Sequence, residues 1–145
     1  MNLAILDTDL LSEILKSKDA HVLTMARQYL AEHQRFAFSE MTVYEVVRGM
    51  RSKRASQQLA AFLRMVGQCE VFAIDRSVLM LAADLWAEAR TGGHPKDDAD
   101  LIIAATALKA QRTLVTGNTT HYSWIVGLQL ADWRVPTTNV DNPLA

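Results

Sequence analysis

Short apolar runs alternate along the chain with longer stretches in which apolar residues recur at helical spacing. The runs are typical of strands buried on both faces, and the stretches are typical of amphipathic helices. We expect strands at 3–6, 36–38, 71–74 and 113–116, with a short last strand at 128–130. We expect helices at 10–16, 20–33, 39–50, 56–66, 77–91 and 97–111, and a loop at 117–121. This alternation predicts an α/β fold with a mostly parallel sheet.

The length of 145 residues suits one domain with a full core. We expect this domain to cover residues 1–135, and residues 136–145, with two prolines and no periodicity, to form a loose tail. No apolar run approaches the roughly 18 residues of a membrane span, and no basic-then-apolar leader opens the chain. The single cysteine, Cys69, cannot form an internal disulfide. Together these features predict a cytoplasmic protein without a membrane partner.

The first expected strand ends at Asp7, whose charge is too costly to bury unpaired, so this residue should lie where the strand leaves the sheet. In open parallel sheets, ligands bind outside the carboxyl ends of the strands. Crossover helices run antiparallel to their strands, so helix N-termini share that edge. We therefore expect polar groups from four parts of the chain to meet there: Asp7, Glu45, Asp97, Asp98, Asp100, Thr116, Gly117 and Asn118.

Several carboxylates at one edge repel one another unless cations lie between them. Hard oxygen ligands suit Mg²⁺ or Mn²⁺. Such an ion can bridge a phosphate and lower the pKa of a bound water, which leads to phosphodiester hydrolysis. The formal net charge of −1 provides no global basic field, so a nucleic-acid substrate would need a local basic patch.

Each of these residues also has a purely structural interpretation. Asp7 or Asp9 suits a cap on the helix that follows, and Glu45 suits a capping box with Thr42. Acids at 97–100 favour the dipole of the next helix, and Asn118 suits a turn. The basic residues near Glu45 are more typical of a solvated face than of a phosphate track: Arg48, Arg51, Lys53 and Arg54.

Four segments carry a resemblance that covers nearly the whole chain, from residue 2 to residue 133. In order, Leu6–Asp9, Val43–Gly49, Asp98–Ala105 and Leu114–Tyr122 resemble the four acidic blocks of PIN-domain ribonucleases. Within that superfamily, the chain is similar to VapC-type toxins of bacterial toxin–antitoxin pairs. Gly117 departs from the family, which often has Asn or a charged residue at this position.

The resemblance implies a three-layer α/β/α sandwich with a five-stranded, mostly parallel sheet. It implies endonucleolytic cleavage of RNA, often a structured tRNA or rRNA, with Mg²⁺ or Mn²⁺ as cofactor. It also implies a homodimer and a VapB-like antitoxin whose C-terminal segment blocks the site.

The resemblance assigns metal binding and catalysis to Asp7, Glu45 and Asp100. Asn118 occupies the fourth position of the family, where Asp or Asn is common. We further expect Thr116 and Asp98 to be auxiliary residues at the site. The expected contacts to the RNA backbone come from Arg48 and Arg51, because affinity for RNA depends on phosphate contacts.

Two other classes of protein fit part of the pattern. Asp7 and Asp9 after an apolar strand resemble the Asp-x-Asp of haloacid-dehalogenase phosphatases, with Asp7 as nucleophile, although Leu10 and Leu11 do not match the residues that normally follow. A catalytically silent PIN-like module would use the same edge only to bind a partner. Trapping of a modified Asp7 would favour the phosphatase, and failure to bind Mg²⁺ or Mn²⁺ would favour the silent module.

Overall fold

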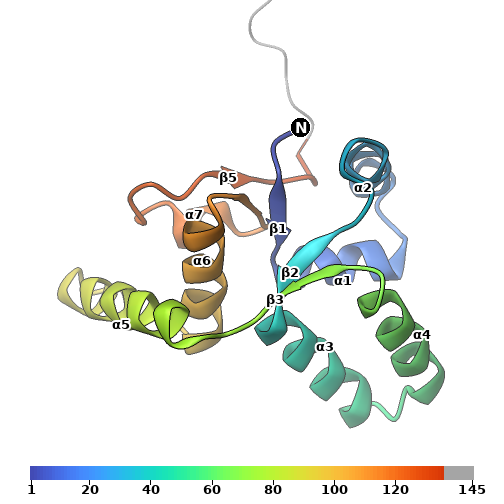
Figure 1. Ribbon diagram of the computed structural model, residues 1–145, viewed down its shortest axis with the longest axis horizontal. Helices are drawn as coiled ribbons and strands as arrows, with labels where there is room; N and C mark the ends of the chain where they lie inside the picture. Colours follow the sequence, from blue (N-terminus) through green and yellow to red (C-terminus); the bar gives the residue numbers. More distant parts are fainter. Residues whose placement is uncertain (136–145) are drawn as a thin grey trace, which may run out of the picture.

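The computed structural model describes residues 1–135, so the expected tail at 136–145 lies outside the described residues. Strands and helices alternate along the chain (Figure 1). The strands are β1 (Ala4–Leu6), β2 (Ala37–Ser39), β3 (Glu70–Phe72), β4 (Thr113–Val115) and β5 (Leu130–Ala131). The helices are α1 (Thr8–Lys16), α2 (Ala20–His33), α3 (Glu40–Ser52), α4 (Ser56–Val66), α5 (Arg76–Thr91), α6 (Asp98–Ala110) and α7 (Thr119–Tyr122). No helix within residues 1–135 is both long and apolar enough to cross a membrane.

The five strands form two hydrogen-bonded groups, in the orders β1-β4-β5 and β2-β3, and every pairing is parallel. Strands β1 and β2 lie next to each other where the two groups meet (Figure 1). The prediction of five parallel strands is therefore confirmed, but the ladder is interrupted between β1 and β2. Because all strands run the same way, their carboxyl ends face one edge.

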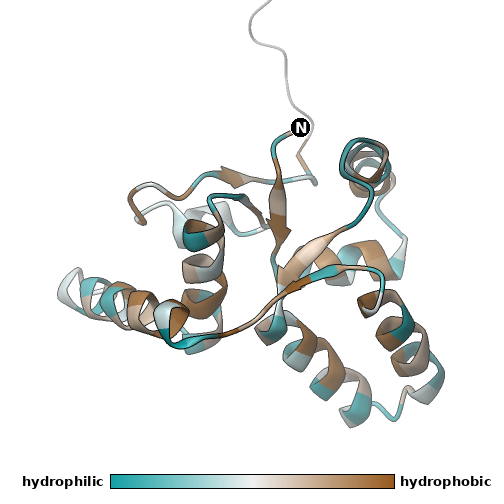
Figure 2. Cartoon of the chain, viewed as in Figure 1, coloured by the Kyte–Doolittle hydropathy of each residue, from teal (hydrophilic) through white to brown (hydrophobic). Residues whose placement is uncertain are grey.

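The strands bury alternate side chains on opposite faces of the sheet, which creates two cores. On one face, Leu6 and Phe38 pack with α1 to α4. On the other face, Ile5 and Leu114 pack with α5 and α6. In Figure 2, β1 and β2 are largely hydrophobic, whereas the helices around them carry both hydrophobic and hydrophilic residues. This is the three-layer α/β/α arrangement that the resemblance implies.

Helix α3 begins one turn earlier than a capping box at Thr42 would require. Ser39 is its N-cap, and the Ser39 hydroxyl accepts a hydrogen bond from the backbone N–H of Met41 at 3.0 Å. Thr42 lies inside the helix and is fully buried. The capping-box interpretation of Glu45 is therefore wrong, because the helix end is already satisfied by another residue.

The loop expected at 117–121 is also wrong in part, because residues 119–122 form the short helix α7. This helix is held to the chain that follows it by the Trp124 indole N–H, which donates to the carbonyl of His121 at 2.9 Å. A four-residue helix has too little length to display a hydrophobic period, so the sequence pattern could not reveal it.

Candidate active site

Asp7 lies at the junction of β1 and α1 and serves both as a cap and as a buried carboxylate. Its backbone N–H continues the β1–β4 ladder by donating to the carbonyl of Val115 at 2.8 Å. Its Oδ1 accepts from the backbone N–H of Thr8 at 2.8 Å, which caps α1. Its Oδ2 accepts from the hydroxyls of Thr116 at 2.8 Å and Tyr122 at 3.1 Å. The side chain is held on both oxygens while only 6% of the residue is exposed.

This environment makes Asp7 hard to ionise. Burial raises the pKa of Asp7 to about 6, and the nearby charge of Asp9 acts in the same direction. Hydrogen bonds from Thr116 and Thr8 oppose the shift, and the carboxylate of Asp100 adds to it. Burial also raises the pKa of Asp9. Such shifted carboxylates mark candidate functional sites, because their charge would be favoured by a partner cation.

Tyr122 connects Asp7 to Asp100 across the sheet edge. Its hydroxyl lies 3.1 Å from Oδ2 of Asp7 and 3.2 Å from Oδ1 of Asp100. Burial and the two carboxylates raise the pKa of Tyr122, so the phenol keeps its proton. The hydroxyl has one proton, so it can donate a hydrogen bond to Asp7 or to Asp100 but not to both at once. The carboxylate that receives no proton then faces the lone pairs of the phenol oxygen, which is unfavourable for a negative charge.

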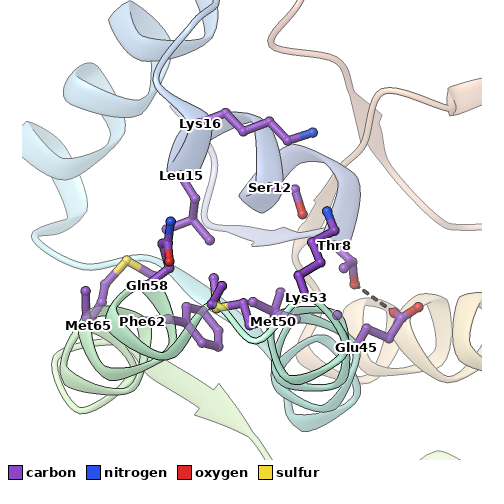
Figure 3. A pocket seen from close by; sticks show the side chains of 14 residues that line it. Thr8, Ser12, Leu15, Lys16, Glu45, Met50, Lys53, Gln58, Phe62 and Met65 are labelled. Atoms are coloured by element: carbon purple, nitrogen blue, oxygen red, sulfur yellow. Dashed lines mark hydrogen bonds between the residues drawn. The ribbon is translucent and has the colours of Figure 1, made fainter.

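Glu45 lies on α3 and reaches the same edge through one hydroxyl. The Thr8 hydroxyl donates to Oε1 of Glu45 at 2.8 Å (Figure 3). The same Thr8 oxygen lies 3.0 Å from the hydroxyl of Thr42, which places Thr8 between α1 and α3. Oε2 of Glu45 lies 3.6 Å from the guanidinium of Arg48. Glu45, Asp7 and Asp100 are therefore linked through Thr8 and Tyr122.

A divalent cation fits the donor set of this edge. Within residues 1–135, no group of three or more His, Cys, Asp or Glu side chains is arranged so that it could hold a metal ion. Mg²⁺, however, usually keeps several waters and is bound through one or two carboxylates. Asp7 and Asp100, which share the Tyr122 hydroxyl, are the two carboxylates here with the hard oxygen atoms that such an ion prefers, and their role as its ligands stays a prediction. A direct metal contact of Glu45 stays a prediction.

The remaining expected site residues differ in how close they come to Asp7. Thr116 is fully buried, and its hydroxyl bonds Asp7 and accepts from the backbone N–H of Asn118 at 3.1 Å. Asn118 is exposed at the N-cap position of α7, with no side-chain capping bond. Asp98 lines a groove between α5 and α6 that also contains Trp86, and its auxiliary role stays a prediction.

The loop that follows β4 is fixed from two sides. The backbone N–H of Gly117 donates to Oδ2 of Asp9 at 3.1 Å. The carbonyl of Gly117 accepts from the guanidinium of Arg134, which also bonds Asp132. A Cβ at position 117 would collide with this guanidinium. The guanidinium is the far end of a flexible, partly exposed side chain, so a residue other than Gly at position 117 would only require Arg134 to move.

An apolar groove of about 700 Å³ begins at Thr8 and Glu45 and continues between α1, α3 and α4 (Figure 3). Its lining is mainly aliphatic and aromatic, and the amines of Lys16 and Lys53 also belong to it. The apolar members include Leu15, Val46, Met50, Phe62 and Met65. The groove thus joins the acidic edge directly to a surface suited to apolar side chains.

Sequence reasoning identified the acids but missed the side chains that hold them. Tyr122 and His121 both contact Asp100, and Tyr122 also contacts Asp7. Both lie in the segment 114–122 that carries the resemblance, directly after a strand end. Their place after the fourth expected strand could have put them near the sheet edge. Nothing in the neighbouring sequence, however, predicts contacts with carboxylates more than 20 residues away.

The chain matches the PIN domain family over residues 4–123 and belongs to it. The tRNA(fMet)-specific endonuclease VapC of Shigella flexneri is 26% identical over 129 residues, which cover 88% of this chain and 96% of the relative. Ribonuclease VapC1 of Methanocaldococcus jannaschii is 28% identical over 123 residues, which cover 83% and 88%. The resemblance to VapC-type PIN-domain ribonucleases is confirmed.

Solved structures agree with this assignment of the fold. The DNA-bound VapBC structure from Salmonella typhimurium has a TM-score of 0.79 at 25% identity, covering 92% of this chain and 99% of that one. VapBC2 from Rickettsia felis, bound to a promoter DNA fragment, has the same TM-score at 21% identity, covering 90% and 98%, and supports the fold alone.

Membership of the PIN family excludes the alternative that this chain is a haloacid-dehalogenase-like phosphatase. The matched region, residues 4–123, contains Asp7 and Asp9, the two acids on which the phosphatase alternative rested. Asp9, the expected acid–base residue of that alternative, uses its own oxygens to accept from the backbone N–H groups of Leu10 and Gly117. Asp9 is therefore engaged in holding the start of α1 and the loop after β4.

Proposed function

We propose that this chain is a Mg²⁺- or Mn²⁺-dependent endoribonuclease that acts in the cytoplasm as the toxin of a toxin–antitoxin pair. The observation that carries the proposal is the pairing of buried Asp7 with Asp100 through the Tyr122 hydroxyl at the carboxyl ends of parallel strands. The PIN family match and the relatives named as VapC ribonucleases support the reaction class. A structured RNA such as a tRNA or rRNA is the proposed substrate.

In this proposal, Asp7 and Asp100 hold the cation, and Glu45 completes the set or deprotonates the attacking water. When bound, the cation supplies positive charge for the phosphate and makes water a better nucleophile at neutral pH. Thr116 and Thr8 orient Asp7 through their hydrogen bonds. Asn118, exposed at the start of α7, is available to orient the phosphate or a water.

Arg48 and Arg51 form the proposed contact to the RNA backbone. Both are exposed on α3, the helix that carries Glu45. The Arg48 guanidinium lies 5.1 Å from the ring centroid of Tyr44, which is itself 57% exposed. An exposed aromatic ring beside cations suits a single-stranded segment of RNA, because bases stack on rings while phosphates bind cations.

The test is RNA cleavage by the purified chain, freed of any antitoxin, with Mg²⁺ or Mn²⁺ and with excess EDTA. We expect cleavage only with metal, and none by Asp100→Asn under either condition. A pooled total-RNA substrate with mapping of new 5′ ends would identify the target without prior choice. Undiminished cleavage in EDTA would contradict the metal assignment, and absence of both cleavage and metal binding would favour the silent module.

The apolar groove beside Glu45 is the proposed seat of the antitoxin segment. Blocking the site requires a partner that lies next to Thr8 and Glu45, and the groove begins at these residues (Figure 3). Its apolar lining and two lysines suit a segment with apolar side chains and acidic flanks. A homodimer of the toxin is part of the same proposal.

Two alanines on α4 provide a matched test of this groove. Ala61 lines it and is exposed, whereas the neighbouring exposed Ala60 does not line it. We expect Ala61→Arg to weaken binding of a VapB-like antitoxin, while metal-dependent cleavage is retained. Ala60→Arg should leave both unchanged. Equal antitoxin affinity for the two variants would contradict this location.

A further inference from the structure

The side chain of His121 forms a second, unexplained contact with the candidate site. Its Nε2 lies 3.0 Å from Oδ2 of Asp100, on the oxygen that Tyr122 does not contact. Adjacent residues of α7 thus hold the two oxygens of one carboxylate from different directions. The side chain of Asp100 is 29% exposed and that of His121 is 27% exposed. Burial therefore does not by itself fix the orientation of the Asp100 carboxylate, and its contacts with protein groups do.

A lysine on the far side of the ring determines how this histidine bonds. Nζ of Lys96 lies 3.3 Å from Nδ1 of His121. An ammonium group can only donate, so Nδ1 must accept, and in the neutral ring the proton then sits on Nε2. Nε2–H therefore donates to Asp100. Lys96 lies just before α6 and His121 lies on α7, so the contact also ties α7 to the segment that leads into the helix carrying Asp100.

We propose that His121, oriented by Lys96, is a positioning residue that fixes the carboxylate of Asp100 for cation binding. This inference rests on the proposed function of the site. A donor of this kind, bonded to a ligating carboxylate, keeps the metal-facing oxygen in one orientation and increases metal affinity without touching the ion. In this arrangement, His121 donates to one oxygen of Asp100, and the Tyr122 hydroxyl, whose proton is shared with Asp7, lies 3.2 Å from the other.

Asn and Gln separate the two nitrogens of the ring. The amide nitrogen of Gln reaches about as far as Nε2, whereas the amide of Asn reaches only about as far as Nδ1. His121→Gln should therefore keep the donor to Asp100, and His121→Asn should lose it while keeping a polar group near Lys96. The comparison holds polarity and approximate size constant and changes only the reach of the donor.

The experiment measures Mn²⁺ binding by calorimetry and single-turnover RNA cleavage for wild type, both His121 variants and Lys96→Met. We expect His121→Asn to weaken Mn²⁺ binding by about tenfold to a hundredfold, the usual range when a metal-binding side chain loses its hydrogen-bond partner, and His121→Gln to stay within about threefold. Lys96→Met should fall between them. The cleavage rate at saturating RNA should fall with metal affinity, while the KM for RNA stays unchanged. Equal Mn²⁺ affinity of His121→Asn and His121→Gln would overturn the proposal.

A measurement without metal or RNA keeps this inference separate from the proposed function. A double-mutant cycle between His121→Asn and Asp100→Asn, followed by urea unfolding in EDTA, reports the contact itself. We expect clearly non-additive effects on the free energy of unfolding. Additive effects would overturn the positioning contact even if the wild type cleaves RNA, whereas non-additive effects in a protein that neither binds Mn²⁺ nor cleaves RNA would contradict only the proposed function.

Discussion

The carboxylates of Asp7 and Asp100 are held by protein groups on each oxygen, whereas Glu45 has one hydroxyl partner and a 3.6 Å ion pair with an exposed arginine. Asp7 and Asp100 lie where β1 ends and where α6 begins, between the two cores. Glu45 lies on α3, beside the open groove. The first pair is preorganised, and Glu45 can move while breaking few interactions.

This difference indicates two roles within the proposed site, one of binding the cation and one of acting on the attacking water. A cation needs fixed ligands, because reorganising them would weaken binding. A residue that orients or deprotonates water must instead adapt as the substrate arrives. Substitutions should therefore separate the two parts: changes at Asp7 and Asp100 should alter metal binding and fold stability together, while changes at Glu45 should lower the rate of cleavage with little effect on fold stability.

The largest expected effect is loss of activity when one of the two proposed metal ligands loses its charge. Asp7→Asn or Asp100→Asn should reduce cleavage by about 10³-fold or more, since each would remove a charge proposed to hold the cation. In cells, expression of the wild type without antitoxin should arrest growth, and either variant should restore it at equal protein level. Growth arrest by both variants would show that the site has been placed incorrectly.

A second effect concerns the stability of the metal-free protein as a function of pH. The pKa of Asp7 is raised to about 6 in the fold, above its ordinary value of 3.8. Between these values the folded state binds more protons than the unfolded state, so the contribution of Asp7 to stability is present below pH 4 and is lost as pH rises through 6. The shift corresponds to about 3 kcal/mol at 1.36 kcal/mol per pKa unit.

Urea unfolding in EDTA between pH 4 and 7 tests this effect through the difference between wild type and Asp7→Asn. Asparagine can keep the bond from Thr8 and cannot ionise, so the variant should gain stability relative to wild type as pH rises. Mn²⁺ should reduce the difference, because a cation favours the ionised form. A difference that does not depend on pH would mean that Asp7 ionises normally.

Sequence reasoning captured the parts of this comparison that depend on short-range pattern. Helices α2 and α4 fall at the expected residues because their apolar faces repeat over several turns. The acids were expected at one edge because parallel strands and their crossover helices impose that polarity. The fixed character of Asp100 was not predictable, because Tyr122 and His121 reach it from a four-residue helix without a period of its own.

The adaptable residue, Glu45, should show a loss of rate with no loss of stability. Glu45→Gln keeps an oxygen to accept from Thr8 and leaves the Ser39 cap untouched, so the free energy of unfolding should change by less than about 0.5 kcal/mol. Single-turnover cleavage should fall by about 10²-fold, the size typical of an acid–base group. Cleavage within a few-fold of wild type would reduce Glu45 to a structural role.

Tyr122→Phe tests how much the Tyr122 hydroxyl, which lies between the carboxylates of Asp7 and Asp100, contributes to the stability of the metal-free protein. The variant removes the only hydroxyl that contacts both Asp7 and Asp100 within residues 1–135 while keeping the ring in the core. We expect the metal-free protein to lose about 2 kcal/mol, the scale of a hydrogen bond to a charged group. Saturating Mn²⁺ should recover part of the loss. Wild-type stability in EDTA would show that the bridge contributes nothing to the fold.

The smallest expected effect concerns Arg48 and Arg51, the exposed arginines on α3, the helix that carries Glu45. Arg48→Ala with Arg51→Ala should weaken RNA binding several-fold at physiological salt, and should flatten the plot of log affinity against log salt by roughly 0.7 for each phosphate that is no longer bound.

The matched control is Arg27→Ala with Arg90→Ala, which removes the same charge from exposed positions on α2 and α5. If only the total charge mattered, both double variants would lower the slope equally. If Arg48 and Arg51 bind phosphates, only their removal changes the slope, because counterion release depends on the number of phosphates bound and not on distant charge. An unchanged slope for Arg48→Ala with Arg51→Ala would assign both arginines to a solvated face.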